Sequence, residues 1–388
     1  MVSSILETKN LTFQYPNGTL ALDDVSIKIP EGKKTVILGS NGSGKSTLFL
    51  HFNGVLRPKK GEIFYAGKRI EYSSRALSEL RTNVSVVLQN PDDQIFSTTV
   101  EEDIAFGPMN LGLERKEIEA RVDEALFLVN LQDVRERPTQ QLSFGQRKRV
   151  ALAGALAMKP KVLMMDEPTA GLDSRMVHEL LELADELNMK GLTVIMSTHD
   201  VETAYEWADE IRVLHRGRLE FSGRPEEFFS EERKVYSLGL VTPVLFEIDR
   251  RFTELNKASH AIPSSIISSR SVQEILLRLF PHKDSKIGRL RLIKVAVQPF
   301  HHKNQLAPPE ASSKEVCVGV YGTMARKWAL ENGMKVDYTF NALDMCVREI
   351  AMGRDFILLT DDVLMPLVQS KLTRLEEHFG IKIPTDIY

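Results

Sequence analysis

Continuous apolar runs, rather than alternating ones, mark the predicted strands in the first part of the chain. Three such runs are "KKTVILGS" (33–40), "KVLMMDEP" (161–168) and "LTVIMSTHD" (192–200). Strands that are buried on both faces carry apolar side chains at successive positions. A helical stretch is predicted after each run, at Lys45 to Phe52, Ser174 to Leu187 and Val201 to Ala208. Strands that alternate with helices predict a parallel α/β core.

Between Pro91 and Thr139 the pattern becomes helical. Its clearest piece is "LERKEIEARVDEALFLVNL" (113–131). We therefore expect a helical subdomain, at about residues 90–160, to interrupt the α/β core.

The predicted secondary structure changes after Gly223. Residues 225–290 are predicted to be mainly helical, and the Pro- and Ser-rich "HHKNQLAPPEASSK" (301–314) predicts a loop or linker. The runs "EVCVGVYG", "KVDYTF" and "DFILLTDD" then alternate with the helical pieces "TMARKWALENG", "ALDMCVREIAMG" and "LVQSKLTRLEEHFG". We predict a first domain at 1–238, a helical connector at 239–290 and a small α/β domain of unassigned role at 291–388.

Composition narrows the class of protein. With 388 residues, 43% hydrophobic and 27% charged, the chain has the profile of a soluble globular protein of two or three domains. A net charge of −3 provides no general attraction to nucleic acid or anionic lipid. The two cysteines, Cys317 and Cys346, favour a reducing compartment. No signal peptide or spanning segment is recognisable. We expect a cytosolic chain that meets a membrane only through a partner.

The strongest chemical signal is "GSNGSGKST", which satisfies the P-loop pattern G-x-x-x-x-G-K-[ST] between an apolar strand and a helix. Glycines free backbone N–H groups to surround phosphates, and the following helix directs its positive end at them. Lys45 is expected to reach the β- and γ-phosphates, and Ser46 to hold Mg²⁺. A flexible Gly/Ser turn is the alternative. The predicted nucleotide-binding residues are Gly39, Ser40, Asn41, Gly42, Ser43, Gly44, Lys45, Ser46 and Thr47.

Polar residues at other strand ends extend this prediction. Asp166 ends an apolar strand, where it is placed to hold Mg²⁺, and Glu167 is placed to polarise the attacking water. An acidic N-cap pair for the next helix is the alternative. His199 follows the third core strand and is a candidate for contacting a γ-phosphate; a packed or capping histidine is equally ordinary.

Gln89 and Tyr15 are two further candidate residues for the nucleotide site. Gln89 closes a strand just before the helical insertion, where it is placed to contact Mg²⁺ or the lytic water. Tyr15 is a candidate to stack on the adenine, with an ordinary core aromatic as the alternative.

The segment "QLSFGQRKR" (141–149) raises an electrostatic question. Ser143 and Gln146 have the spacing of a capping box, so a helix begins here. Three cations then follow at the positive end of the helix dipole, where cations are disfavoured. An anion that approaches this helix start would explain them.

These motifs together resemble the ATP-binding cassette ATPases. The P-loop, Gln89, "LSFGQ", "MMDEP", "AGLD" (170–173) and "STHD" occur in that family's order and spacing, over residues 5–235. The resemblance implies that Ser143 and Gly145, with Gln146 and Asp173 nearby, contact ATP held by the P-loop of a second subunit, with some of the cations assisting. Phe144 departs from the commonest spelling, which has glycine, and is tolerable if it points away from the nucleotide.

Within the family, "QNPDDQIFSTTVEEDIAFGPMNLGL" and "ALAGALAMKPKVLMMDEPTAGLD" resemble the cobalt and nickel energy-coupling-factor ATPases. The resemblance implies ATP and Mg²⁺ as cofactors, a homo- or heterodimer, and membrane subunits gripped by residues 90–112 at the cytoplasmic face of the cell membrane. A vitamin importer of the same type is the first alternative. A soluble cassette ATPase acting on ribosomes or DNA is less favoured, because the chain has one cassette and no long coiled coil, and no nucleic-acid partner is expected.

Residues 291–388 resemble no family that we recognise. "EVCVGVYGTMARKWALENG" has the strand–Gly–helix form of a βα unit, which binds phosphate in some proteins and nothing in most. His301 and His302 are adjacent, and neighbours on a strand point to opposite faces, so they are a poor chelate. Packing or regulation is favoured over metal sensing or a fused enzyme.

Overall fold

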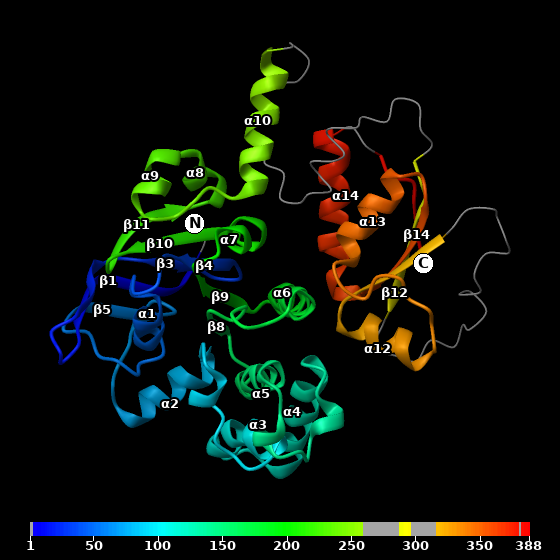
Figure 1. Ribbon diagram of the computed structural model, residues 1–388. Helices are drawn as coiled ribbons and strands as arrows, with labels where there is room; N and C mark the ends of the chain where they lie inside the picture. The colour runs from blue at the N-terminus through cyan, green and yellow to red at the C-terminus, as the bar shows by residue number, and fades with distance from the viewer. Residues whose placement is uncertain (1–2, 259–286, 296–315, 380–381) are drawn as a thin grey trace. The chain divides into compact units, whose positions relative to one another are not determined.

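The computed structural model describes residues 3–258, 287–295, 316–379 and 382–388. The chain divides into two compact units (Figure 1). The first comprises Met1–Met176 and Gly191–Pro243, and the second comprises Val177–Lys190 and Val244–Tyr388.

A six-stranded sheet forms the centre of the first unit, in the order β11-β10-β4-β9-β8-β7. All neighbouring pairs are parallel except β10 and β11. The strands are β4 (Lys34–Leu38), β7 (Val84–Val87), β8 (Val162–Asp166), β9 (Thr193–Thr198), β10 (Glu210–His215) and β11 (Arg218–Gly223). The predicted parallel α/β core is confirmed. Because β4, β9, β8 and β7 are consecutive neighbours, the segments that follow them meet at one edge of the sheet.

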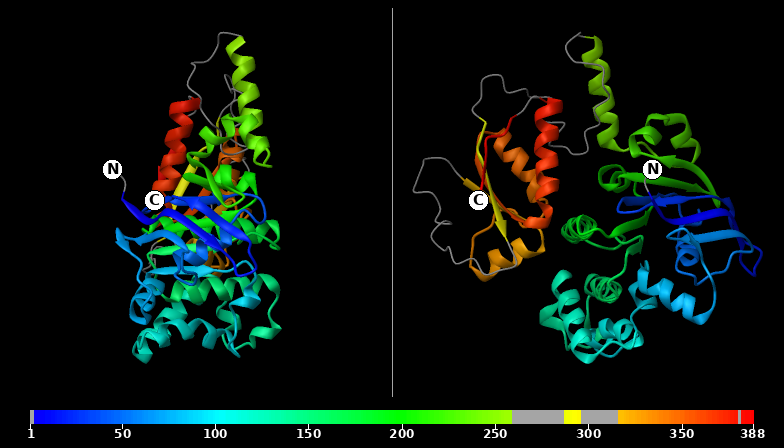
Figure 2. Two further views of the ribbon diagram at one scale, coloured as in Figure 1. Left: turned by 90° about the vertical axis from the view of Figure 1, so that its left-hand side faces the viewer. Right: turned by 180° about the vertical axis from the view of Figure 1, so that it is seen from behind.

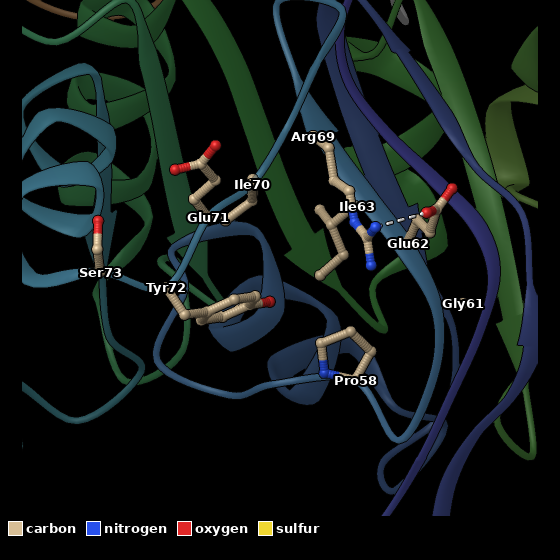
Figure 3. Close-up of a pocket in the computed structure, with 9 residues that line it drawn as sticks. All are labelled: Pro58, Gly61, Glu62, Ile63, Arg69, Ile70, Glu71, Tyr72 and Ser73. Atoms are coloured by element: carbon tan, nitrogen blue, oxygen red, sulfur yellow. Dashed lines mark ion pairs between the residues drawn. The ribbon is translucent and has the colours of Figure 1, made fainter.

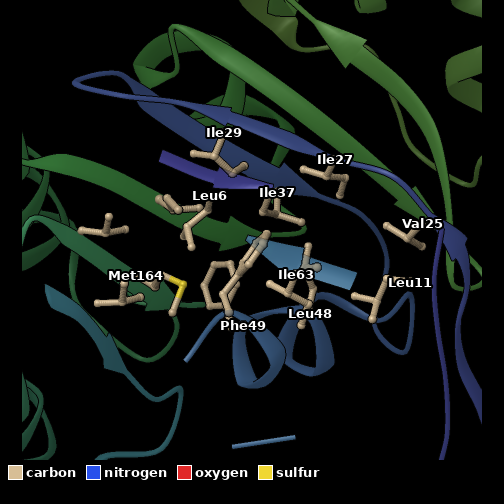
Figure 4. Close-up of a cluster of buried hydrophobic side chains, with 14 of the residues drawn as sticks. Leu6, Leu11, Val25, Ile27, Ile29, Ile37, Leu48, Phe49, Ile63 and Met164 are labelled. Carbon is tan, nitrogen blue, oxygen red and sulfur yellow. The ribbon is translucent and has the colours of Figure 1, made fainter. Parts of the chain in front are cut away.

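A second, antiparallel sheet covers the helix that follows the P-loop. It has the order β2-β1-β5-β6, with β3 paired to β1. Leu48 and Phe49 of α1 (Lys45–Phe52) point into the cluster between the two sheets (Figure 4). Burial of each such side chain contributes about 1.5–3 kcal/mol, so α1 is held firmly. The strands are β1 (Ser4–Gln14), β2 (Leu20–Val25), β3 (Lys28–Pro30), β5 (Lys60–Tyr65) and β6 (Lys68–Arg69).

The segment between β7 and β8 is helical. Helix α5 (Phe144–Ala157) packs against α3 (Val100–Asn110) and α4 (Arg115–Leu128), which gather at one end of the unit (Figure 2, cyan to green). Both α3 and α5 begin with capping boxes, at Thr99 and Ser143. The remaining helices of this unit are α2 (Ser74–Asn83), α7 (Val201–Trp207), α8 (Pro225–Ser230) and α9 (Glu232–Ser237). None of the helices within the described ranges is long and apolar enough to span a membrane.

The second unit contains a four-stranded parallel sheet in the order β13-β14-β12-β15. Phe356 and Leu358 of β14 are fully buried in its core. The strands are β12 (Leu290–Val295), β13 (Val316–Tyr321), β14 (Asp355–Asp361) and β15 (Thr385–Ile387). The helices are α10 (Val244–Ala258), α12 (Thr323–Glu331), α13 (Ala342–Ala351), α14 (Met365–Phe379) and the part of α6 (Ser174–Met189) that begins at Val177.

One predicted strand of the second unit is wrong. "KVDYTF" (335–340) forms only an isolated bridge between Tyr338 and Gly319. One of its side chains bonds to β13 instead: the Asp337 carboxylate accepts a hydrogen bond from the Val318 amide at 2.9 Å. The whole predicted 301–314 linker, with His301 and His302, and residues 259–286 of the predicted connector lie outside the described residues.

Candidate functional site

The P-loop joins β4 to α1 at the carboxyl edge of the parallel sheet. Gly42 and Gly44 have φ values of +78° and +105°, which side chains with a Cβ rarely adopt. A Cβ on Gly39 would lie 2.3 Å from the Leu214 carbonyl oxygen. Glycine is therefore required here by backbone geometry and by close approach. The loop therefore has a specific backbone conformation, which disfavours the alternative of a flexible Gly/Ser turn.

Lys45 is the first residue of α1 and is buried. Its ammonium group donates to the Gly39 carbonyl at 2.7 Å and to the Ser40 carbonyl at 3.2 Å. It also pairs with Glu167 Oε1 at 3.2 Å. The predicted phosphate-binding cation and the predicted base are thus in direct contact, although 122 residues separate them in the sequence.

Glu167 lies just past the end of β8, in an unusual backbone conformation. Its φ is +45°, and its side chain is 6% exposed. Its amide donates to Ser197 Oγ at 3.0 Å, and its Oε2 lies 3.0 Å from His199 Nδ1. The carboxylate therefore lies between Lys45 and His199, as a residue would that orients a water against a phosphate. The alternative of an acidic N-cap pair does not fit, because α6 begins seven residues later and Asp173 accepts from the Met176 amide at 2.8 Å.

The candidate Mg²⁺ ligands are oxygen donors at adjacent strand ends. Asp166 is buried at the end of β8, and its Oδ1 accepts a hydrogen bond from Ser197 Oγ. Ser46 is exposed on α1, and Gln89 is exposed two residues beyond β7. One carboxylate, one hydroxyl and one amide oxygen fit Mg²⁺, which takes few protein ligands and completes its shell with phosphates and water.

Tyr15 is half-buried just after β1. Its hydroxyl lies 3.1 Å from Thr47 Oγ1 on α1, and its ring meets Phe13 edge-on at 5.0 Å. Tyr15 is therefore beside the P-loop helix and also packs against the core. The ring thus has a contact in the core, and its stacking on adenine stays a prediction.

The signature segment begins α5 with the predicted capping box. Ser143 Oγ accepts from the Gln146 amide at 3.3 Å, and Gln146 Oε1 accepts from the Ser143 amide at 3.0 Å. Ser143 is exposed, whereas Gly145 is buried against Met176. The serine hydroxyl and the helix dipole are thus presented outward at the start of α5.

All three cations that follow have acceptors in their own chain. Arg147 donates to the Leu142 carbonyl at 2.7 Å and pairs with Asp92 at 2.7 Å. Lys148 donates to three backbone carbonyls beyond β8, and Arg149 donates to the Val129 carbonyl at 3.2 Å. These contacts lie within the chain, and the expectation that some of the cations assist a phosphate held by a second subunit stays a prediction.

Phe144 points along the surface of its own chain. Its ring lies against Gly171, where a Cβ would approach a ring carbon to 2.9 Å. Gly171 has a φ of +75°, so this turn depends on glycine. The residue that departs from the usual spelling packs against the "AGLD" segment.

Sequence reasoning missed the residues that hold this edge together. Ser197 links the Asp166 side chain and the Glu167 amide across two strands. Gln94 accepts from the Leu88 amide at 2.9 Å and donates to the Val86 carbonyl at 3.2 Å, which shapes the turn around Gln89. Ser197 begins the quoted motif "STHD" and Gln94 lies in the quoted segment that starts at Gln89, but neither side chain was assigned a role.

A hollow of about 480 Å³ lies elsewhere in the first unit (Figure 3). Pro58 and Tyr72 line it, with the ion pair of Glu62 and Arg69 at 3.1 Å. It contains none of the predicted nucleotide-binding residues, and it is therefore separate from the P-loop site.

The βα turn of the second unit is occupied by carboxylates. Gly322, with a φ of +109°, leads into α12. Asp361 accepts from the amides of Met324 at 3.1 Å and Ala325 at 2.7 Å, and Glu186 accepts from the Thr323 amide at 3.2 Å. These contacts satisfy the helix start with negative charge, which disfavours phosphate there. Among the described residues no cluster of three metal-ligating side chains occurs.

Asp361 supplies a pH-dependent prediction. Burial, and then the nearby Glu186 charge, raise its pKa from 3.8 to about 6. The folded state therefore binds more protons than the unfolded state between about pH 4 and pH 6, so stability falls as pH rises through this window. From pH 4 to pH 7 the wild-type unfolding free energy should fall by up to about 3 kcal/mol relative to that of Asp361→Asn.

Urea unfolding followed by Trp328 fluorescence in a Trp207→Phe background measures this difference. Asp362→Asn, a change at an exposed neighbour, is the matched control and should keep the wild-type slope. Identical pH dependence in Asp361→Asn and wild type would contradict the assignment.

Comparison with known proteins finds a matching family and similar relatives for this chain. A family model described as ABC transporter matches residues 22–170. The energy-coupling factor transporter ATP-binding protein EcfA2 of Methanospirillum hungatei is 36% identical over 389 residues, which cover 98% of this chain and 95% of the relative. The cobalt import ATP-binding protein CbiO of Rhodobacter capsulatus is 45% identical over 247 residues, or 64% of this chain and 88% of the relative.

Two solved structures are similar to the cassette. CbiO1 from Clostridium perfringens, described as part of the ABC transporter complex cbiONQ, has a TM-score of 0.56 and 40% identity over 67% of this chain and 100% of its own. The cassette MJ0796, in a dimeric post-hydrolysis state bound to ADP and phosphate, has a TM-score of 0.53 and 29% identity over 57% of this chain and 98% of its own. The match to Methanospirillum hungatei thus extends beyond the cassette into the second unit.

Proposed function

The chain belongs to the ATP-binding cassette ATPases of the energy-coupling-factor type, and from that premise we propose that it drives the import of cobalt or nickel ions. It is an ATPase subunit of a transporter. The proposal concerns its site residues, its partners and its cargo.

The contact of Glu167 with both Lys45 and His199 carries the assignment of the site. On this proposal the P-loop amides and Lys45 bind the phosphates of ATP, which replace the present Lys45 contacts. Glu167 accepts a proton from the attacking water, and His199 supports the carboxylate and the terminal phosphate. Tyr15 stacks on the adenine.

Ser46, Asp166 and Gln89 would hold Mg²⁺, whose charge stabilises the phosphates. Ser197 supports this assignment, because its hydroxyl donates to one oxygen of Asp166 and thereby orients that carboxylate. Gln89 follows β7 and precedes α3, so its loop joins the site to the helical segment.

A second cassette is proposed to complete each ATP site. The exposed Ser143 hydroxyl and the start of α5 present donors at the surface, where a phosphate held by a second chain would contact them. The dimeric state of the similar cassette MJ0796 supports this arrangement. Asp173 directly precedes α6 and follows Gly171, which the Phe144 ring contacts, so it would lie near the same interface.

Membrane subunits are proposed to dock on residues 90–112. Phe96, Phe106 and Met109 are 64%, 46% and 60% exposed, and the two phenylalanine rings meet edge-on at 4.5 Å. Clustered exposed apolar residues of this kind indicate an interface. A helix from a membrane partner would cover them, so the chain would be peripheral at the cytoplasmic face.

The proposed assignment of the cargo rests on the name of one relative. The Rhodobacter capsulatus protein is named for cobalt import, whereas the energy-coupling-factor relatives are named without a cargo. A vitamin importer of the same type is therefore the competing assignment, and a soluble cassette ATPase is the more distant one.

Purification of the tagged chain from its native membranes tests the proposal. Integral-membrane subunits should co-purify, and vesicles reconstituted with the complex should accumulate cobalt or nickel only with ATP. Lys45→Ala is the negative control. Uptake of a vitamin instead of metal would support the first alternative, and a chain that purifies without membrane subunits would contradict a transport function.

A further inference from the structure

Lys148 is a buried lysine whose contacts were not foreseen from the signature motif. It lies in the first two turns of α5 and is 7% exposed. Its Nζ donates to the carbonyl oxygens of Glu167 at 3.3 Å, Pro168 at 3.0 Å and Ala170 at 2.6 Å. Burial lowers its pKa, and the nearby Glu167 charge opposes that shift.

The three carbonyls belong to the turn that begins at the proposed base. Glu167 has a φ of +45°, a conformation that residues with a Cβ adopt only when their surroundings hold them there. Three carbonyl dipoles that point at one place repel one another, and an ammonium group with three donors neutralises this repulsion. Lys148 therefore stabilises the backbone conformation that the Glu167 side chain starts from.

A second contact ties the same helix to the same segment. The Phe144 ring lies against Gly171, and the Lys148 ammonium lies 5.4 Å from the centre of that ring. The start of α5 is thus attached at two places to residues 167–171 of its own chain.

We propose that Lys148 is a positioning residue for ATP hydrolysis, which holds Glu167 so that its carboxylate lies between Lys45 and His199. The proposal rests on the proposed function, because it assigns Glu167 as the base. It also links the two ATP sites of a dimer. The helix that faces the partner's nucleotide is bonded directly to the backbone of its own chain's base.

The test is Lys148→Met, which keeps most of the length of the unbranched side chain and removes its donors. The turnover number should fall about 10- to 100-fold, because a small displacement of a base is costly, while KM for ATP stays within about twofold. Lys161→Met, at an exposed lysine just before β8, is the matched control and should retain the wild-type rate. Lys148→Leu, which also has no donor, serves with the same expectation if the methionine variant does not fold.

A double-variant comparison separates positioning from general stability. In single-turnover assays, Lys148→Met should add less than about a twofold loss when Glu167 is already Gln, because residues that act through one another are not additive. A wild-type rate in both Lys148 variants, or a full additional loss in the Glu167→Gln background, would overturn the proposal. If the wild type hydrolyses ATP and Glu167→Gln strongly reduces the rate, the proposed function stands whichever result the Lys148 variants give.

Discussion

Replacement of Glu167 by Gln is expected to reduce ATP turnover by about two to four orders of magnitude and to leave ATP binding intact. The amide is nearly isosteric with the carboxylate, but it cannot accept the proton of the attacking water. Lys45 would keep its hydrogen bonds to Gly39 and Ser40 or exchange them for phosphate contacts. Binding and hydrolysis should therefore separate in this variant.

Steady-state phosphate release measures the loss, and the affinity for ATP is measured by equilibrium binding. The variant should also accumulate as an ATP-bound dimer in size-exclusion chromatography, because ATP then remains between the two cassettes. Glu220→Gln, at an exposed position on β11, controls for the loss of one negative charge. Turnover within a few-fold of the wild type would exclude Glu167 as the base.

The second large effect concerns the division of one site between two chains. Ser143→Arg and Lys45→Ala should each abolish hydrolysis in a homodimer. An equal mixture should regain on the order of a quarter of the wild-type rate, because half of the randomly formed dimers then hold one intact site. In that dimer the intact P-loop of one chain faces the intact signature of the other.

Two different affinity tags allow the mixed dimer to be isolated and counted. A mixture of two differently tagged Lys45→Ala chains has no intact P-loop and is the control for recovery caused by mixing alone. The absence of any recovered activity in purified mixed dimers would count against a site shared between subunits.

Several elements could be predicted from the sequence because their determinants are local. The runs that form β4, β8 and β9 are apolar at successive positions, and Lys45–Phe52 was predicted with the bounds of α1. The P-loop could be recognised because its glycines are needed for local backbone angles. The capping box at Ser143 is likewise a contact between residues three apart.

The wrong strand in the second unit shows where local patterns stop being informative. "KVDYTF" has the composition of a strand, and β13 lies at the edge of its sheet with one side open to it. The Tyr338 backbone bridges to Gly319, but the Asp337 carboxylate accepts from the Val318 amide, so no strand ladder extends along this segment. β12 was not recognised at all, although it is central, because its pairing with β14 and β15 joins segments distant in sequence.

What the sequence determined by itself was the family, the P-loop and the identity of Asp166 and Glu167, since each depends on residues that are close together in the chain. The tertiary structure alone decided which groups meet. Lys45 contacts Glu167, His199 approaches the same carboxylate, and Ser197 orients Asp166, because four parallel strands end side by side. The three cations after "LSFGQ" find acceptors in residues up to 55 positions away in the sequence. Their partners depend on the packing of α5 against other segments, which no periodicity or spacing within the motif encodes.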